Sequence, residues 1–248
     1  MDFSGRVALV TGGARGIGRA TVLSLAKAGA DVVVNYLENR EAATEVVTRA
    51  QSLGRKAIAI QANVGVPAQV EALFDALDRE FGRLDILINN AGVGTIKPLE
   101  EVTPDFWDEI LRVDLTGPFL CTKAAAARMK QRRYGRIVNV SSIGGAHGMA
   151  MDAPYSAAKS GIFGLTKSTA RYLGAFNITV NTVCPGPTDT ELSRKLPAEM
   201  REAVAKSSAL GRMGTPEDVA DAILFFASDY SRHVTGQMIL VDGGIVMP

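Results

Sequence analysis

Residues 7–18 read Val7-Ala8-Leu9-Val10-Thr11-Gly12-Gly13-Ala14-Arg15-Gly16-Ile17-Gly18, and this stretch decides the fold. Its apolar start predicts a buried strand over Val7–Val10, and Gly16–Ala28 has helical spacing that ends at Gly29. Glycines let the backbone turn tightly between the two, and the N-terminus of a helix attracts a pyrophosphate. The next strand, expected at Asp31–Asn35, completes a unit of about 30 residues. We therefore interpret the turn as a dinucleotide site rather than as a tight loop alone.

The same alternation of short apolar runs and longer helical patterns continues to the end of the chain. We expect strands also at Ala57–Gln61, Leu84–Asn89, Ile137–Val140, Thr179–Val183 and Met238–Val241. We expect helices near Glu41–Leu53, Pro67–Phe81, Asp105–Arg132, Tyr155–Ala175 and Pro216–Ser228, with a kink or break at Gly117-Pro118. This order predicts one α/β domain over residues 1–248, a doubly wound parallel sheet (Rossmann fold) with helices on both faces.

Composition excludes several functional classes. The chain has 248 residues, 47% of them hydrophobic and 21% charged, as in an ordinary soluble protein. A net charge of +1 favours neither nucleic acid nor a membrane as partner. The N-terminal residues do not resemble a signal peptide, and no apolar run approaches about 18 residues, so we expect a cytoplasmic protein. Cys121 and Cys184 are expected to be buried, and no cysteine–histidine cluster indicates a metal.

Tyr155 and Lys159 are four residues apart in a predicted helix and therefore share a face. An ammonium about 4 Å from a phenol oxygen stabilises phenolate by roughly 4 kcal/mol at an effective dielectric constant of about 20. The phenol can then act as a general acid or base near neutral pH. Alone, this pair is weak evidence for catalysis, because surface helices often produce the same spacing by chance. Beside a dinucleotide turn, and with Ser142 upstream, it indicates acid–base chemistry next to a bound cofactor.

The end of the second predicted strand indicates which dinucleotide binds. An acidic residue there would bind the ribose 2′-hydroxyl and repel a 2′-phosphate. The sequence Val34-Asn35-Tyr36-Leu37 has no acid before Glu38. Arg15 and Arg40 could contact a phosphate, although each could equally be a solvated surface residue. The pattern favours NADP(H), and NAD(H) stays an alternative.

At this point the chain resembles the classical short-chain dehydrogenase/reductase family over essentially its whole length. Within that family it is most similar to the 3-oxoacyl-[acyl-carrier-protein] reductases, through Ser156-Ala157-Ala158-Lys159 and Ile178-Thr179-Val180-Asn181. The other matching motifs are Thr11–Gly18, Asn89-Asn90-Ala91-Gly92, Ser142, Tyr155-x-x-x-Lys159, Pro185-Gly186 and Val241-Asp242-Gly243-Gly244.

The resemblance implies roles for single residues. Tyr155 would donate a proton to a substrate carbonyl that receives hydride from nicotinamide, and Ser142 would orient that carbonyl. Lys159 would stabilise the phenolate and hold the nicotinamide ribose, and Asp114 completes the catalytic set. The cofactor would contact Gly12, Ala14, Arg15, Gly16, Ile17, Gly18, Asn35, Tyr36, Arg40, Asn63, Val64, Asn90, Ala91, Gly92, Tyr155, Lys159, Pro185, Gly186, Thr188 and Thr190.

Three positions depart from the family pattern. Asn63 replaces the usual aspartate, and its amide oxygen can still accept a hydrogen bond from the adenine amino group. Asp114 replaces the usual asparagine, and its carboxylate would partly offset the pull of Lys159 on Tyr155, so we expect activity with a shifted pH optimum. The segment Ala175-Phe176-Asn177-Ile178 lacks the basic residue that carrier-protein reductases have there.

Two segments, near residues 143–154 and 187–212, are expected to contact substrate. Glycines and methionines in the first predict an adaptable, apolar wall. His147 within it could bind a polar group, although a lone loop histidine more often faces solvent. Asp189–Leu210 in the second is expected to form a mobile helical lid.

The most specific function expected is NADPH-dependent reduction of a 3-oxoacyl thioester to the (3R)-hydroxyacyl product. An acyl carrier protein is then a candidate partner, with Arg132 and Arg133 as candidate contacts. The alternative is another secondary alcohol or ketone, such as a sugar, polyol, cyclic alcohol or diketone, which the missing cation favours. A cofactor-binding module without turnover is a remote alternative, because the catalytic side chains are retained. The resemblance also implies a homotetramer, with the helices Asp105–Arg132 and Tyr155–Ala175 in one interface and the C-terminal strand region in another.

Overall fold

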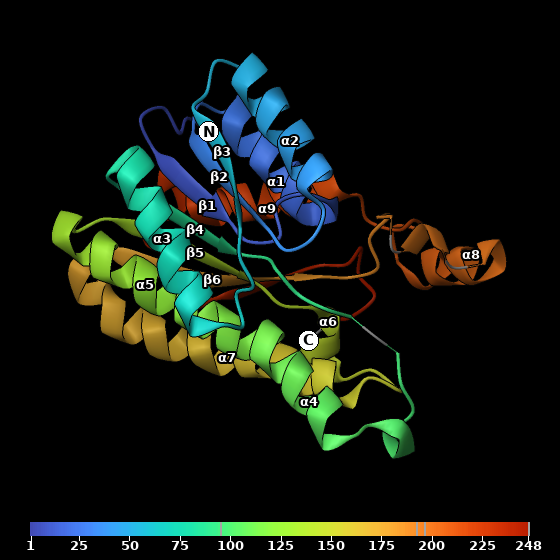
Figure 1. The fold of residues 1–248 in the computed structure, drawn as a ribbon. Helices are drawn as coiled ribbons and strands as arrows, with labels where there is room; N and C mark the ends of the chain where they lie inside the picture. Colours follow the sequence, from blue (N-terminus) through green and yellow to red (C-terminus); the bar gives the residue numbers. More distant parts are fainter. Residues whose placement is uncertain (95, 192, 196, 248) are drawn as a thin grey trace.

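Seven parallel strands form one sheet in the order β3-β2-β1-β4-β5-β6-β7, with helices on both faces (Figure 1). The computed structural model describes residues 1–94, 96–191, 193–195 and 197–247. The strands are β1 Val7–Val10, β2 Asp31–Tyr36, β3 Ala57–Gln61, β4 Ile86–Asn89, β5 Gly135–Val140, β6 Ile178–Pro185 and β7 Met238–Val241. The predicted doubly wound sheet is confirmed. All strands are parallel, but β2 and β3 are added on one side of β1 and β4 to β7 on the other. Ligands of such folds bind at the carboxyl ends of the strands where this change occurs, here between β1 and β4.

Two hydrophobic cores separate the sheet from its two helix layers. In β1, Ala8 and Val10 belong to one core and Leu9 belongs to the other, because successive strand side chains point to opposite faces. The first core lies under α1 Gly16–Lys27, α2 Arg40–Ser52 and α9 Pro216–Ala227. The second lies under α3 Pro67–Phe81, α5 Gly117–Arg132 and α7 Ala153–Leu173. Both cysteines are fully buried, as predicted, and burial raises the pKa of each thiol to about 12.

The helical region expected over Asp105–Arg132 is interrupted, as predicted, and the interruption begins at Arg112, before Gly117. The chain forms α4 Pro104–Leu111, a π turn (η2) over Arg112–Thr116, and then α5. Pro118 has no N–H for the Asp114 carbonyl, and its ring would clash with that carbonyl in a regular α-helix. The Gly117 N–H instead donates to the Arg112 carbonyl, five residues back. The break expected at Gly117-Pro118 is therefore confirmed, and it takes the form of a π turn that contains Asp114.

The two predicted substrate segments also contain regular structure. The first holds a short helix, α6 Ile143–His147, where a loop was expected. The second holds η4 Ser193–Lys195 and α8 Ala198–Ser207, while Leu192 and Leu196 lie outside the described residues. Three further 3₁₀ turns are η1 Leu99–Glu101, η3 Gly174–Phe176 and η5 Asp229–Ser231.

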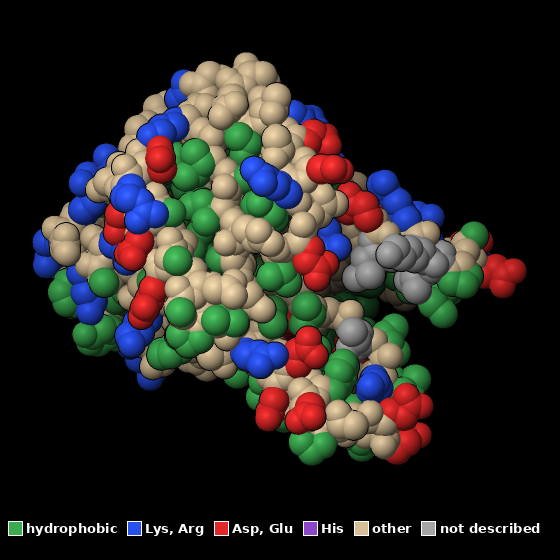
Figure 2. All heavy atoms as spheres, in the orientation of Figure 1, with side chains coloured by type: hydrophobic (Ala, Val, Ile, Leu, Met, Phe, Trp, Pro, Cys, Tyr) green, Lys and Arg blue, Asp and Glu red, His purple; other side chains and the backbone are tan. Residues whose placement is uncertain are grey.

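The surface carries charges of both signs, interspersed over the face that Figure 2 shows. Apolar side chains are exposed on the two parts that extend from the body, including Trp107 of α4 and Met200 of α8. In the described part of the chain, no helix is both long and apolar enough to cross a membrane.

Candidate active site

The turn between β1 and α1 has an open helix N-terminus. Gly12 and Gly16 adopt φ values of +61° and +50°, a left-handed region that favours glycine. Arg15 is the N-cap residue of α1, and its side chain is exposed and makes no cap hydrogen bond. The first turn of α1 contains no acidic residue. Its N–H groups are therefore suited to a phosphate, and the turn fits a dinucleotide.

Two amides, the buried Asn35 and the partly buried Asn90, fix the shape of this turn. The Asn35 Oδ1 accepts a hydrogen bond from the Gly12 N–H at 3.3 Å, and its Nδ2 donates to the Ala62 carbonyl at 3.0 Å. The Asn90 Nδ2 donates to the carbonyls of Thr11 and Gly12 at 2.9 and 3.1 Å. The turn is thus tied to the ends of β2 and β4. Direct contact of Asn35 or Asn90 with the cofactor stays a prediction.

The remaining residues predicted near the turn differ in exposure. Tyr36 and Ala14 are each 8% exposed and pack in the first core, Ile17 packs against that core, and Gly18 is buried. Arg40 is exposed in the first turn of α2. An exposed arginine thus follows the end of β2, and its contact with a 2′-phosphate stays a prediction.

The segment after β3 lies against the second core. Val64 is buried there, and the Asn63 Oδ1 accepts a hydrogen bond from the Gly65 N–H at 2.9 Å. After β4, the Ala91 N–H donates to Thr11 Oγ1 at 3.0 Å, and Gly92 is exposed. These segments and the glycine turn all follow the carboxyl ends of parallel strands. The predicted cofactor site requires this placement.

Ser142 is positioned by the end of β5 and by α6. It is the N-cap residue of α6, and its Oγ accepts a hydrogen bond from the Gly144 N–H at 3.0 Å. Gly145 allows α6 to lie directly on α7, because a Cβ atom there would be 2.6 Å from the Lys159 carbonyl carbon. Ser141 Oγ donates to the Lys159 carbonyl at 2.8 Å. The backbones around Ser142 and Lys159 are therefore held together.

Tyr155 and Lys159 share a face of α7, as their spacing predicted. The Lys159 Nζ lies 5.4 Å from the centroid of the Tyr155 ring. Lys159 is only 4% exposed, whereas Tyr155 is half-buried. The Lys159 Nζ also donates to the Val140 carbonyl at 3.3 Å. The ammonium is thus fixed between the end of β5 and the tyrosine ring.

Asp114 is fully buried beside this lysine. Its Oδ1 accepts a hydrogen bond from the Val93 N–H at 2.8 Å, and its Oδ2 lies 3.1 Å from Lys159 Nζ. Among the described residues, that Oδ2 has no well-aligned hydrogen bond, so the contact is mainly electrostatic. Burial lowers the pKa of Lys159, but the negative charge of Asp114, with Tyr155, outweighs it and raises that pKa above its ordinary value. Lys159 therefore stays charged at neutral pH.

Asp152, which the sequence interpretation left as the end of a substrate loop, belongs to the same cluster. It is the N-cap residue of α7 and is 5% exposed. Burial, and then the charge of Asp114, raise the pKa of this carboxyl to about 6. Its spacing of three residues from Tyr155 was the available sequence signal, because such residues share a helix face.

The segment after β6 returns to the glycine turn. Pro185 ends β6, and Thr188 Oγ1 donates to the Gly186 carbonyl at 2.9 Å. The side chain of Thr190 lies against Gly16, with its Cγ2 3.4 Å from the position of a Cβ there. Two segments predicted to contact the cofactor, the glycine turn and the segment after β6, therefore lie side by side.

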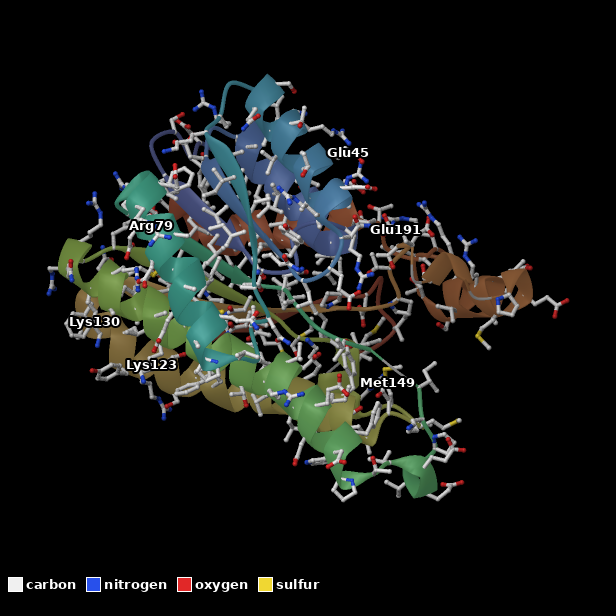
Figure 3. All side chains as sticks on the ribbon, viewed as in Figure 1. Glu45, Arg79, Lys123, Lys130, Met149 and Glu191 are labelled. Carbon is white, nitrogen blue, oxygen red and sulfur yellow. The ribbon has the colours of Figure 1, made fainter. Side chains whose placement is uncertain are left out.

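The substrate side is more exposed. Met149 follows α6 and Glu191 leads toward α8, on the side of the molecule from which α4 and α8 extend (Figure 3). His147 is exposed. Arg132 and Arg133 lie just before the amino end of β5, whereas Ser142 follows its carboxyl end. The fold therefore does not bring the two arginines to the catalytic side chains.

Across the described ranges, no group of three or more His, Cys, Asp or Glu side chains is placed to hold a metal.

Comparison with known proteins gives matches over nearly the whole chain. Residues 12–246 match the family model described as enoyl-(acyl carrier protein) reductase. A 3-oxoacyl-[acyl-carrier-protein] reductase from Synechocystis sp. is 42% identical over 246 residues, which is 99% of this chain and 98% of the relative. The cis-4-hydroxycyclohexanecarboxylate dehydrogenase of Sinomonas cyclohexanicum is 44% identical over 243 residues, which is 98% of this chain and 97% of the relative.

Solved structures agree with these relatives. A crystal structure from Agrobacterium tumefaciens, proposed to be a gluconate dehydrogenase, superposes with a TM-score of 0.95 at 34% identity and covers 99% of this chain and 98% of that one. The relatives differ in substrate and share oxidoreductase chemistry. The chain belongs to the short-chain dehydrogenase/reductase family and is an oxidoreductase acting on CH–OH and carbonyl groups.

Proposed function

We propose that this enzyme reduces a substrate carbonyl with NADPH, with Tyr155 as the general acid. The observation that carries the proposal is the buried, charged Lys159, whose Nζ lies 5.4 Å from the Tyr155 ring centroid and 3.1 Å from Asp114. Ser142 lies at the end of the adjoining strand. An ammonium held there stabilises a phenolate, which is the product of proton donation by tyrosine.

Each side chain has one task in this mechanism. When bound, the nicotinamide cofactor supplies hydride to the carbonyl carbon. Ser142 Oγ already accepts the Gly144 N–H, so its own hydrogen is free to donate to the carbonyl oxygen and orient it. Tyr155 gives its phenolic proton to the same oxygen as the charge develops. Lys159 stabilises the resulting phenolate and cannot move away, because its Nζ is held between Val140 and Asp114.

NADP(H) is the proposed cofactor. The open N-terminus of α1 is suited to the pyrophosphate. Arg15 and Arg40 are both exposed beside the end of β2, where they can pair with a 2′-phosphate. The acid of β2, Asp31, is at the first position of the strand, whereas its carboxyl end is Asn35-Tyr36, so no carboxylate from that end would repel the phosphate.

A 3-oxoacyl thioester is the substrate best supported by similarity, through the Synechocystis relative at 42% identity. A second candidate is a hydroxylated or cyclic secondary alcohol. The absence of a basic residue in Ala175–Ile178 favours it, and so does the Sinomonas relative that is named for a cyclic hydroxyacid. The buried carboxyl of Asp152 beside Tyr155 is a third reason.

A homotetramer is also proposed. Phe119 of α5 and Tyr172 of α7 are 47% and 65% exposed, and Met238 and Ile239 of the edge strand β7 are 46% and 41% exposed. Apolar side chains at two separate faces are suited to two interfaces. Light scattering after size exclusion measures the mass directly, and a monomer at micromolar concentration would refute this proposal.

One assay tests the reaction. NADPH absorbance is followed with acetoacetyl-CoA, an acyl-carrier-protein thioester, and a panel of sugars, diketones and cyclic ketones, and each is repeated with NADH. Fastest turnover of the carrier thioester with NADPH supports the first substrate. Turnover confined to free ketones supports the second candidate. NADPH binding without oxidation on the whole panel would refute the enzymatic proposal in favour of a silent binding module.

A further inference from the structure

Asp152, Tyr155 and Lys159 form one stripe along α7. Their spacings of three and four residues place them on a common helix face. Side chains of a helix lean toward its N-terminus, so the Tyr155 ring leans over the turn that begins at Asp152. The N-cap position of Asp152 and the effect of the Asp114 charge on it therefore place its carboxyl at the end of α7 that carries Tyr155 and Lys159.

Asp152 is buried within a segment that is otherwise open. It is 5% exposed, whereas Met149 and Met151 are 45% and 53% exposed. Met151 adopts a φ of +61°, and its carbonyl accepts a hydrogen bond from the Lys97 N–H at 2.7 Å. The backbone before Asp152 is thus fastened to the loop that follows β4. The Asp152 side chain is thus buried, and the charge of Asp114 acts on it.

The Asp152 carboxyl has an unused acceptor. An N-cap carboxylate usually accepts a hydrogen bond from the second or third N–H of its helix, but Asp152 makes no such bond, and the second residue is Pro154. Its Oδ1 has no hydrogen-bond partner anywhere in the described residues. Lys159, the cation on the same stripe, is already paired with Asp114. Because burying a carboxylate oxygen without a partner is unfavourable, a bound ligand is a suitable source of the missing donor.

We propose that Asp152 is a specificity-determining residue whose carboxylate accepts a hydrogen bond from a second hydroxyl group, close to the reacting carbon of the substrate. This inference rests on the proposed hydride transfer at Tyr155. It follows that the enzyme prefers hydroxyketones and the corresponding diols to substrates with only acceptor oxygens at that position. A thioester carbonyl is such an acceptor, and the ionised carboxylate of Asp152 would repel an anionic substituent there.

The ionisation of Asp152 is consistent with this role. Burial raises the pKa of the carboxyl to about 6, so most molecules carry the ionised, accepting form above neutral pH. Hydrogen bonds to a charged acceptor are stronger than those to a neutral one. An asparagine in its place keeps an acceptor oxygen of similar geometry without the charge.

The test compares 2-hydroxycyclohexanone with cyclohexanone, both with NADPH at pH 8. In Asp152→Ala we expect kcat/KM for the hydroxyketone to fall about 10- to 100-fold, mainly through KM, because a hydrogen bond to a charged group is lost. The value for cyclohexanone should change less than about threefold. Asp152→Asn should lie between wild type and Asp152→Ala, and it guards against a folding defect of the alanine variant. Asp108→Asn, an equal charge change at an exposed position of α4, is the control.

Several results would overturn the inference. They are equal losses on both ketones, no loss on either, or a wild type without preference for the hydroxyketone. If wild type oxidises NADPH with no carbonyl, the proposed function fails, and calorimetry still decides the inference. In that case 1,2-cyclohexanediol and cyclohexanol are titrated into the NADP⁺ complex. Tighter binding of the diol that Asp152→Ala abolishes supports the role of Asp152, and equal binding refutes it.

Discussion

Asp85 and Asp114 are two fully buried aspartates, the first near the amino ends of the strands and the second near their carboxyl ends. They differ in how many of their carboxylate oxygens have hydrogen-bond partners. Asp85 precedes β4, and its Oδ2 accepts hydrogen bonds from the Val7 N–H at 2.9 Å and from Arg83 Nε at 2.8 Å. Its Oδ1 accepts from Arg83 Nη2 at 2.6 Å. Asp114 has one backbone hydrogen bond and a lysine that is shared with the Tyr155 ring and the Val140 carbonyl.

We interpret the difference as separating a structural carboxylate from one that belongs to the proposed active site. Every acceptor of Asp85 is bonded, so it joins β1 to β4 and leaves nothing for a ligand. Around Asp114 the pairing is incomplete, and Asp152 nearby has an oxygen with no partner in the described chain. Groups with unsatisfied polar atoms and shifted pKa values gather where chemistry occurs. Each prediction below replaces one of these aspartates, or Tyr155, which shares the site with Asp114 and Asp152.

The largest effect is expected from Tyr155→Phe. It removes the proton donor and keeps the ring that packs over Lys159, so kcat should fall on the order of 10³-fold. The Kd of NADPH, measured by fluorescence titration, should change little, because Lys159, which we propose to hold the ribose, is retained. A variant with more than about a tenth of wild-type kcat would contradict Tyr155 as general acid.

Asp85→Ala should act on stability and spare the chemistry. The substitution leaves the Val7 N–H and the Arg83 guanidinium without their acceptor, and we expect the free energy of unfolding to fall by about 2–4 kcal/mol. Urea denaturation followed by circular dichroism measures this loss. The folded variant should keep wild-type kcat/KM, since Asp85 is at the edge of the sheet away from Tyr155. A large loss of activity in folded protein would remove the distinction between the two aspartates.

Asp152→Asn should raise stability at neutral pH. The folded state raises the pKa of Asp152 from its ordinary value near 4 to about 6, so it favours the protonated carboxyl. Stability is therefore lost as pH rises from about 4 to 6, and asparagine avoids that loss. Above pH 7 the variant should gain on the order of 1–2 kcal/mol after allowance for solvent screening. Thermal melts at pH 4 and pH 7.5 check this, and an equal shift at both values would contradict it.

The sequence was a good guide to the sheet because each strand is a short apolar run between breakers. The bounds of β1, β3 and β7 match the prediction, since a polar residue precedes each apolar run and another ends or follows it. Helix α6 was missed because its five residues include two glycines, which are poor helix formers. It forms through tertiary contacts, namely the cap at Ser142 and the close packing of Gly145 on α7.

The candidate site was predictable where residue spacing fixes geometry. Tyr155 and Lys159 share a helix face whatever the rest of the chain does. The burial of Asp152 depends on the loop before it and on its tie to Lys97, which no local pattern encodes. The prediction for Asn35 was incomplete for a similar reason, because its bond to the Gly12 N–H depends on the pairing of β1 with β2.

The smallest effect, and the sharpest test of the contrast, is expected from Asp114→Asn. The amide oxygen can still accept the Val93 N–H, so the π turn and the fold should persist. Without the carboxylate, the pKa of Lys159 falls from its raised value, and one negative charge fewer opposes a phenolate at Tyr155. Alcohol oxidation needs that phenolate as base, so kcat/KM should begin to rise at a lower pH than in wild type, by up to about one unit. Asp108→Asn should leave the profile in place. Superimposable profiles for Asp114→Asn and wild type would mean that incomplete pairing at this aspartate has no part in the chemistry.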